Sequence, residues 1–326
     1  MSLQEISLEI TQQCPNHCIH CSSCASWKTN QYLPFDLLCI TIDQAVKLGA
    51  KIICLSGGEP CVHPDFVKIV RYIHFKGLAC YVYTSGIFYD GTSYQALPDG
   101  LLKDIFGSVD KMIFNYEAAD SATYDSIMGT DFGGYYIMRE SIKKVVKMNI
   151  QSETHVVPMK INCHQIPLIV EQCDKLGIER ISFLRLVLHG RALENKDKVC
   201  LSEEEIKEIK KIIREISMSK SVSIRLGIPF SDCTNRINCL AGTKKINIRY
   251  DGVVYPCEAF KNDLPVNFTE TEPENIYKKT LGDIYCNSSY LQEIRSKLVA
   301  YQNVNTCENC INQYYKKKEK LNEYRF

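Results

Sequence analysis

Three cysteines stand close together near the start of this chain, in the run Cys14-Pro15-Asn16-His17-Cys18-Ile19-His20-Cys21. The C-x3-C-x2-C spacing puts three thiols on one short loop, where they can converge on a single metal centre. A [4Fe–4S] cube normally takes four thiolates, so three ligands would leave one iron free for another chelator. The alternatives are disulfides, or a zinc site with a fourth ligand from Cys24 or His17.

Composition favours metal binding over disulfides. The chain has 326 residues, 17 of them cysteine, and Glu5 and Glu9 interrupt any apolar signal segment at its start. Such a chain is expected in a reducing cytoplasm, where cysteines bind metals more often than they form disulfides. A formal net charge of +1 gives no argument for nucleic acid binding. No stretch approaches the length of a membrane span, so we expect a cytoplasmic protein without a membrane partner.

Short apolar runs alternate with amphipathic runs through roughly the first 215 residues. Six β–α units in succession predict a parallel sheet with helices outside it, too few for a closed eight-stranded barrel. In such a sheet, functional groups gather at the carboxyl ends of the strands, and the cysteine loop follows the first one. The expected strands are 6–11, 51–56, 80–85, 111–116, 152–158 and 181–187, and the expected helices include 65–76, 135–148, 166–176 and 202–219, the last with a capping box at Ser202 and Glu205.

The pattern changes after about residue 225. Two alternating runs, 245–250 and 253–257, flank Asp251-Gly252, which predicts a hairpin with a two-residue turn. Helical patterns follow near 289–298 and 310–324. We therefore expect two domains, 1–222 and 223–326, the second a small separate module.

Four further cysteines belong to this second part. Cys239 precedes the hairpin, Cys257 closes it, and Cys307 and Cys310 form a distal C-x2-C pair. Together they make a four-ligand set, either for an iron–sulfur cluster or for a structural zinc. Cys233 lies six residues before Cys239 and could compete as a ligand, donate a hydrogen atom or be a bystander.

A second motif ends the second predicted strand, at Gly57-Gly58-Glu59. Two glycines let a backbone approach a ligand closely, and the carboxylate can accept hydrogen bonds from an ammonium group. By itself the motif would be a turn before a helix in most proteins. Its position one β–α unit after the cysteine loop makes a shared site the better interpretation.

Together, the cysteine loop and Gly57-Gly58-Glu59 resemble the radical SAM superfamily. The resemblance implies an open (βα)6 partial barrel in which S-adenosylmethionine (SAM) chelates the free iron and Glu59 holds its amino group. His20 fits the aromatic position of the family before the third cysteine. Ser85 replaces the asparagine that relatives often carry before a glycine after strand three.

The resemblance also implies further SAM contacts. Asn115 and Glu117, at the end of strand four, would face the ribose hydroxyls. Arg185 on strand six would pair with the SAM carboxylate or form a salt bridge at the strand end. Arg191 either belongs to a turn or faces the active site.

The implied chemistry begins with the reduction of the cluster. An external one-electron donor of the flavodoxin or ferredoxin type reduces the cluster, SAM is cleaved, and a 5′-deoxyadenosyl radical abstracts hydrogen from the substrate. The run from Cys239 to Cys257 resembles the SPASM/twitch extension, and the single C-x2-C favours twitch, with one auxiliary [4Fe–4S] cluster. With four thiolates that cluster has no open iron, so we expect it to accept an electron from the substrate radical.

The substrate is the least constrained expectation. Most SPASM and twitch enzymes modify ribosomally made peptides, which predicts a peptide maturase, with direct peptide binding or a separate peptide-recognition protein. One alternative is a dehydrogenase of a small alcohol or aminocyclitol. Another, from a different class, is a non-catalytic iron–sulfur sensor, against which the SAM motif Gly57-Gly58-Glu59 argues.

Overall fold

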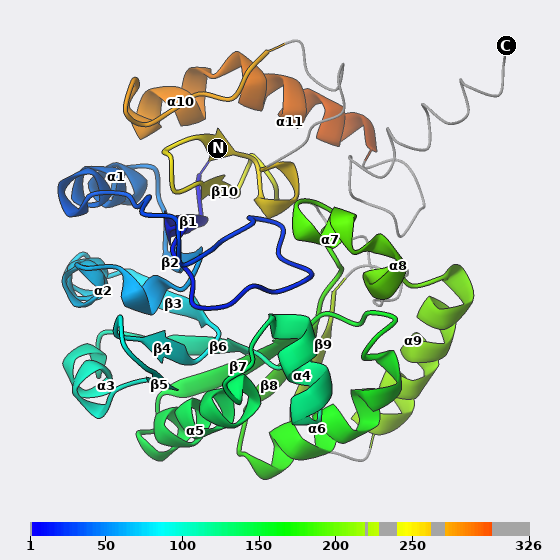
Figure 1. Ribbon diagram of the computed structural model, residues 1–326. Coiled ribbons are helices and arrows are strands. Elements are labelled where there is room, and N and C mark those ends of the chain that lie inside the picture. Colours follow the sequence, from blue (N-terminus) through cyan, green and yellow to red (C-terminus); the bar gives the residue numbers. More distant parts are fainter. Residues whose placement is uncertain (1, 219–220, 228–239, 262–270, 302–326) are drawn as a thin grey trace, which may run out of the picture.

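In the computed structural model, residues 2–218, 221–227, 240–261 and 271–301 are described, and they contain one large sheet with helices around it (Figure 1). The strand order is β11-β10-β1-β2-β3-β6-β7-β8-β9. All pairs are parallel except β10 with β11. The six expected strands are all present, as β1 (Glu5–Thr11), β2 (Ile52–Gly57), β3 (Ala79–Thr84), β6 (Lys111–Asn115), β7 (Gln151–Val156) and β8 (Arg180–Phe183). The predicted fold class, an open α/β partial barrel, is confirmed.

Helices pack on the outer face of the sheet, as expected for β–α units (Figure 1). The predicted capping box is present at the start of α9 (Glu203–Ser217), where the Glu205 N–H donates to Ser202 Oγ at 3.1 Å and the Ser202 N–H donates to Glu205 Oε2 at 2.7 Å. The other helices of the β–α part are α1 (Phe35–Lys47), α2 (Phe66–Phe75), α3 (Asp99–Ile105), α4 (Ser121–Met128), α5 (Gly134–Lys147), α6 (Ile166–Lys175), α7 (Arg191–Glu194) and α8 (Lys196–Val199).

The two faces of the sheet differ in polarity. On β1, Ile6, Leu8 and Ile10 belong to the apolar core, whereas the alternate residues Ser7 and Glu9 are buried polar side chains. The helix-covered face is therefore apolar and the inner, concave face is polar. This contrasts with closed barrels, whose interiors are filled by layers of branched aliphatic side chains.

The hairpin near residue 251 differs from the prediction in two ways. Between β10 (Lys245–Ile248) and β11 (Val254–Tyr255), the Arg249 N–H donates to Val253 O at 2.9 Å. This bond closes a loop of three residues, 250–252, where two were expected. The Gly252 N–H donates to Arg249 O at 2.8 Å and Gly252 has φ +84°, as in a type I turn followed by a left-handed residue. The hairpin also has no sheet of its own, because β10 pairs with β1.

A seventh strand on the opposite edge was not predicted. β9 (Ser223–Leu226) pairs with β8 in parallel. It lies directly after the expected boundary at 222/223, and β10 also belongs to the main sheet. The division into two domains stays a prediction.

Two helices follow in the C-terminal part. α10 (Leu281–Asn287) contacts α1, where the Leu281 N–H donates to Gln44 Oε1 at 2.5 Å. α11 (Ser289–Tyr301) confirms the helix expected at 289–298. The helix expected at 310–324 lies outside the described residues. Among the helices that the structure describes, none is long and apolar enough to cross a membrane.

Candidate active site

The cysteine loop leaves β1 and lies over the strand ends in the middle of the molecule (Figure 1). The end of α4 holds its centre, since the His17 N–H donates to Met128 O at 3.0 Å and the Ile19 N–H donates to Ile127 O at 2.8 Å. Gly129 ends this helix with φ +64°, and a Cβ there would lie 2.4 Å from His17 O. Only glycine allows both the left-handed turn and this close approach.

Arg191 holds the loop from the other side. Its Nε donates to Cys18 O at 2.8 Å, its Nη2 donates to Ala25 O at 3.0 Å, and its backbone N–H donates to Cys21 O at 3.1 Å. The sequence alone did not decide whether Arg191 belongs to a turn or faces the active site. In the structure this buried side chain anchors the cysteine loop through backbone carbonyls.

Two of the three thiols, those of Cys14 and Cys18, lie in a setting that opposes their ionisation. Burial raises the pKa of Cys14, and the nearby charges of Cys18 and Glu59 raise it further. The pKa of Cys18 is likewise raised, first by burial and then by Cys21. Thiolates at these positions need nearby positive charge, which the irons of a cluster supply.

The distances between candidate ligands are relevant to the alternative of a zinc site at the cysteine loop. Among the residues that the structure describes, no three His, Cys, Asp or Glu side chains lie close enough together to hold one metal ion. A single zinc at this loop needs such convergence. A cubane does not, because each thiolate binds a different iron. The three thiols of Cys14, Cys18 and Cys21 match the ligand set of a [4Fe–4S] cluster with one open iron.

Gly57 and Gly58 lie where the backbone after β2 meets the chain that leaves β1. A Cβ on Gly57 would lie 2.2 Å from Thr11 O, and one on Gly58 would lie 2.1 Å from Gln13 O. The backbone here is bonded to the chain leaving β1, with the Gly58 N–H 2.6 Å from Thr11 O. The glycines thus let the backbone approach the base of the cysteine loop, and their contact with the cofactor stays a prediction.

Glu59 is buried and its carboxylate is held by neighbouring donors. Oε1 accepts from Thr84 Oγ1 at 2.7 Å and from the Cys61 N–H at 3.3 Å. Oε2 accepts from the backbone N–H and the hydroxyl of Ser85, at 2.8 and 2.7 Å. Burial raises the pKa of Glu59, and these hydrogen bonds partly oppose the rise. Ser85, predicted to contact the cofactor, contacts Glu59.

His20, Asn115 and Glu117 come together although they are far apart in sequence. Glu117 Oε1 lies 3.6 Å from His20 Nε2 and 3.4 Å from Asn115 Nδ2, and its Oε2 accepts from the Val157 N–H at 2.9 Å. Burial raises the pKa of Glu117 to about 7. Burial, and then the charge of Arg191, lowers the pKa of His20 to about 4, so this imidazole is neutral.

Several polar atoms at this edge of the sheet are buried without a hydrogen-bond partner in the described part of the chain. They include His20 Nδ1, Arg185 Nη1 and both amide atoms of Asn16. Arg185 lies just after β8, which ends at Phe183 and not at 187 as expected. Such orphaned atoms are costly unless a ligand satisfies them, so they fit a polar cofactor at this face.

The second cysteine set is visible in part. Cys257 is half-buried and precedes a short 3-10 turn, η3 (Glu258–Phe260). Cys233, Cys239, Cys307 and Cys310 lie outside the described residues. The four-ligand set therefore stays a prediction.

Comparison with known families decides the identity of this arrangement. A family model for the radical SAM superfamily matches residues 8–187, which hold the cysteine loop and every strand that contributes to the candidate site. The chain belongs to the radical SAM superfamily. A second model, an iron–sulfur cluster-binding domain named SPASM, matches residues 239–311. This radical SAM chain is therefore an enzyme with a SAM-binding [4Fe–4S] cluster and an auxiliary iron–sulfur site, and not a non-catalytic sensor.

Curated relatives of this radical SAM chain are distant. The tungsten-containing aldehyde ferredoxin oxidoreductase cofactor-modifying protein of Pyrococcus furiosus is 25% identical over 315 residues, which cover 88% of this chain and 82% of the relative. The PqqA peptide cyclase of Ruegeria pomeroyi is 25% identical over 282 residues, covering 85% of this chain and 72% of the cyclase.

Solved structures share the fold at low identity. Streptococcus suis SuiB, bound to the precursor peptide SuiA, has a TM-score of 0.73 at 15% identity, covering 90% of this chain and 67% of SuiB. The enzyme anSMEcpe, with bound AdoMet and the Cp18Cys peptide, has a TM-score of 0.65 at 11% identity, covering 93% and 84%. At these identities the likeness concerns the fold alone.

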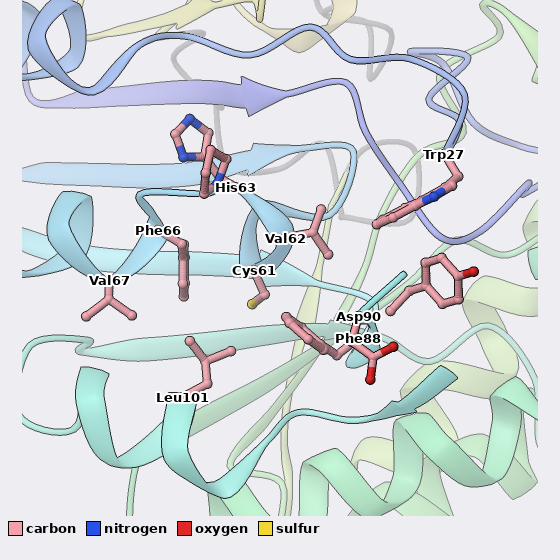
Figure 2. A pocket seen from close by; sticks show the side chains of 11 residues that line it. Trp27, Cys61, Val62, His63, Phe66, Val67, Phe88, Asp90 and Leu101 are labelled. Carbon is pink, nitrogen blue, oxygen red and sulfur yellow. The ribbon is translucent and has the colours of Figure 1, made fainter. Parts of the chain in front are cut away.

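A groove of about 480 Å³ lies outside this cluster of predicted residues. Figure 2 shows Trp27 of the cysteine loop at one end and Val67 and Leu101 at the other. Phe88 and Cys61 line its middle. No predicted site residue lines the groove, so it is distinct from the candidate cofactor site.

Proposed function

We propose that this radical SAM enzyme is a maturase that oxidatively modifies a peptide. The observation that carries the proposal is the recurrence of peptides among its relatives. PqqA peptide cyclases recur among the curated relatives, and solved structures of this fold hold the peptides SuiA and Cp18Cys. The curated relatives and the solved structures thus both support a peptide as the class of substrate.

In this proposal, Cys14, Cys18 and Cys21 hold the SAM-binding cluster. When bound, that cluster supplies the electron that splits SAM into methionine and a 5′-deoxyadenosyl radical. Arg191 and the end of α4 fix the backbone that carries the three thiols. Their rigidity matters because catalysis of hydrogen abstraction depends on placement of the reacting atoms.

Glu59 is the proposed acceptor for the SAM ammonium. A carboxylate offers about four acceptor positions, and donors from Thr84, Ser85 and Cys61 engage all of them. The longest of these contacts, 3.3 Å from the Cys61 N–H, is the one that an ammonium displaces most easily. Arg185, whose Nη1 has no hydrogen-bond partner among the described residues, is the proposed partner of the SAM carboxylate.

The cluster of His20, Asn115 and Glu117 is proposed to face the ribose. Burial raises the pKa of Glu117 to about 7. Near neutral pH this side chain can therefore accept a hydrogen bond from a hydroxyl or donate one to it. Neutral His20 keeps one nitrogen, Nδ1, without a protein partner among the described residues. These are the properties that a site for a polar, uncharged sugar requires.

The remaining parts of the proposal concern the auxiliary site and partners. Cys239, Cys257, Cys307 and Cys310 are proposed to hold a single auxiliary cluster that accepts the second electron of the oxidation. Cys233 is proposed as a bystander. A flavodoxin or ferredoxin is the proposed donor of the first electron, and a separate protein is the proposed means of peptide recognition.

A second candidate keeps a small molecule as the substrate. The Pyrococcus furiosus relative is described as modifying a cofactor, and it matches this chain over most of both lengths. An alcohol or aminocyclitol belongs to the same class of small substrate. The polar inner face of the sheet suits either kind of substrate, since Asn247 there has both amide atoms buried and unpartnered within the described residues.

The test is anaerobic turnover with SAM, dithionite and a candidate peptide encoded beside the gene. We expect a mass loss of about two hydrogens or a new cross-link in the peptide, with one 5′-deoxyadenosine per modification. If the peptide stays unmodified while an alcohol or a cofactor precursor is oxidised, the second candidate replaces the first.

A further inference from the structure

Lys261 joins the C-terminal part of the chain to the cysteine loop. It lies four residues after Cys257, and its side chain is buried. Its Nζ donates to Ser23 Oγ at 2.6 Å and forms an ion pair with Glu9. Glu9 is on β1, just before the loop, and Ser23 is two residues after Cys21. One ammonium group thus bridges both ends of the segment that carries the three cysteines.

The backbone around Lys261 is also fixed. Arg249 Nη1 donates to Lys261 O at 2.7 Å, and His189 Nε2 lies 3.2 Å from Ala259 O. The first contact comes from the β10–β11 hairpin and the second from the segment after β8. The backbone that carries Lys261 is therefore held in place by two separate parts of the fold.

The ion pair itself is incompletely satisfied. Glu9 Oε2 is buried and has no hydrogen-bond partner among the described residues. A buried ion pair stabilises a fold only when its remaining polar atoms are satisfied. Apolar side chains in its place often give equal stability. Stability alone is therefore a weak reason for a lysine here.

The neighbourhood of Lys261 suggests another reason. Burial acts to lower the pKa of Lys261, but the charges of Glu9 and then Cys21 outweigh it, so the pKa is raised. The lysine is thus charged, and its contact with Ser23, two residues after Cys21, places this charge at the cysteine loop. Inside a protein such interactions are screened much less than in water.

We propose that Lys261 is a positioning residue that holds a fixed positive charge beside the Cys21 side of the SAM-binding cluster. Reduction adds one negative charge to a cluster, and a nearby cation stabilises the reduced form. Lys261 therefore raises the reduction potential of this cluster. Because it follows Cys257 closely, the same segment serves both iron–sulfur sites.

The chain offers a matched control in Lys245. This lysine is also mostly buried and paired with carboxylates, at 2.8 Å from Glu5 and 3.1 Å from Glu258. It is the first residue of β10 and pairs in register with Glu5, the first residue of β1. It therefore lies at the opposite end of the strands from the cysteine loop.

The experiment is a redox titration of the reconstituted holoenzyme, followed by the electron paramagnetic resonance signal that changes when SAM is added. Only a cluster with an open iron gives such a change. We expect Lys261→Met to shift the midpoint to lower potential, Lys261→Arg to stay near wild type, and Lys245→Met to have no effect. Glu9→Gln should shift the midpoint in the opposite direction, because it removes the compensating negative charge.

Several results would overturn the inference. One is an unchanged midpoint in a fully loaded Lys261→Met enzyme, and another is an equal shift in Lys245→Met. If Lys261→Met does not retain its cluster, Glu9→Gln decides, since an unchanged or lowered midpoint there contradicts the proposal. A SAM-responsive signal that persists without Cys14, Cys18 and Cys21 would overturn the cluster site as well as the role of Lys261.

Discussion

At the scale of single residues, the candidate site is a set of buried groups whose charges are set by burial. Cys14, Cys18, Glu59 and Glu117 all have raised pKa values, and burial is the largest cause for each. The site is therefore built to receive positively charged or polar groups. A cluster and a cationic sulfonium cofactor supply them.

Glu59→Gln tests the ammonium site. The substitution removes a charge-assisted hydrogen bond, worth roughly 1.5–3 kcal/mol, or on the order of 10- to 150-fold in SAM affinity. An anaerobic SAM titration of the reconstituted enzyme measures the change. Glu153→Gln, another buried carboxylate on the inner face of the sheet, is the control. Equal SAM affinity in Glu59→Gln and wild type would remove Glu59 from the site.

Glu117 predicts a pH dependence of stability in the metal-free protein. Its pKa in the folded state is raised to about 7 from its ordinary value of 4.5, so the folded state binds the proton more tightly. Stability therefore falls as pH rises from 4.5 to 7, by roughly 3 kcal/mol from this group alone. Denaturant unfolding between pH 5 and 7.5 should show this loss in wild type and a smaller one in Glu117→Gln. Parallel curves for the two proteins would contradict the assignment.

At the scale of elements, the sequence predicts the features that depend on residues close together in the chain. The six strands are short runs between turn and helix signals, and the capping box of α9 lies within four residues. β9 was missed because Ser223-Ile224-Arg225-Leu226 is short and half polar. The contact of His20 with Glu117 and the anchoring of the loop by Arg191 depend on residues far apart in sequence. No local pattern reveals them, although the glycines at 129 and 190 mark the close approaches that permit them.

Gly129→Ala tests how α4 supports the cysteine loop. The new Cβ would meet His17 O at 2.4 Å, in addition to the strain of a positive φ. Gly107→Ala is a matched control, with φ +76° but nothing within 4 Å of the added Cβ. A left-handed alanine costs roughly 1–2 kcal/mol, so Gly107→Ala should show that loss only. Gly129→Ala should lose more stability and also retain less iron after reconstitution. Equal behaviour of the two variants would show that the contact with the loop is unimportant.

At the scale of the whole molecule, both halves of the chain meet at β1. The cysteine loop follows β1, and the hairpin that ends at Cys257 pairs with it. The pairing of β10 with β1 was not predicted, because the register between distant strands is not visible in the sequence. The elements that carry the two iron–sulfur sites thus belong to one sheet. A substrate radical would form at the inner face of that sheet.

Cys257→Ala tests the proposed role of the auxiliary site. If that cluster accepts the second electron, the variant should still cleave SAM to 5′-deoxyadenosine but should form little oxidised peptide. Quantifying both products in one anaerobic reaction gives the coupling ratio. A folded variant that lacks the auxiliary cluster yet keeps the wild-type ratio would exclude electron transfer through it.

The central claim is that Cys14, Cys18 and Cys21 hold the cluster that cleaves SAM. The most direct measurement is 5′-deoxyadenosine formation under dithionite by the variant with all three cysteines changed to alanine, together with its iron content. With one cluster at each site, wild type should carry about eight irons per chain. We predict that the variant keeps about half of the iron and forms no 5′-deoxyadenosine. Full iron content, or continued cleavage of SAM, would contradict the account.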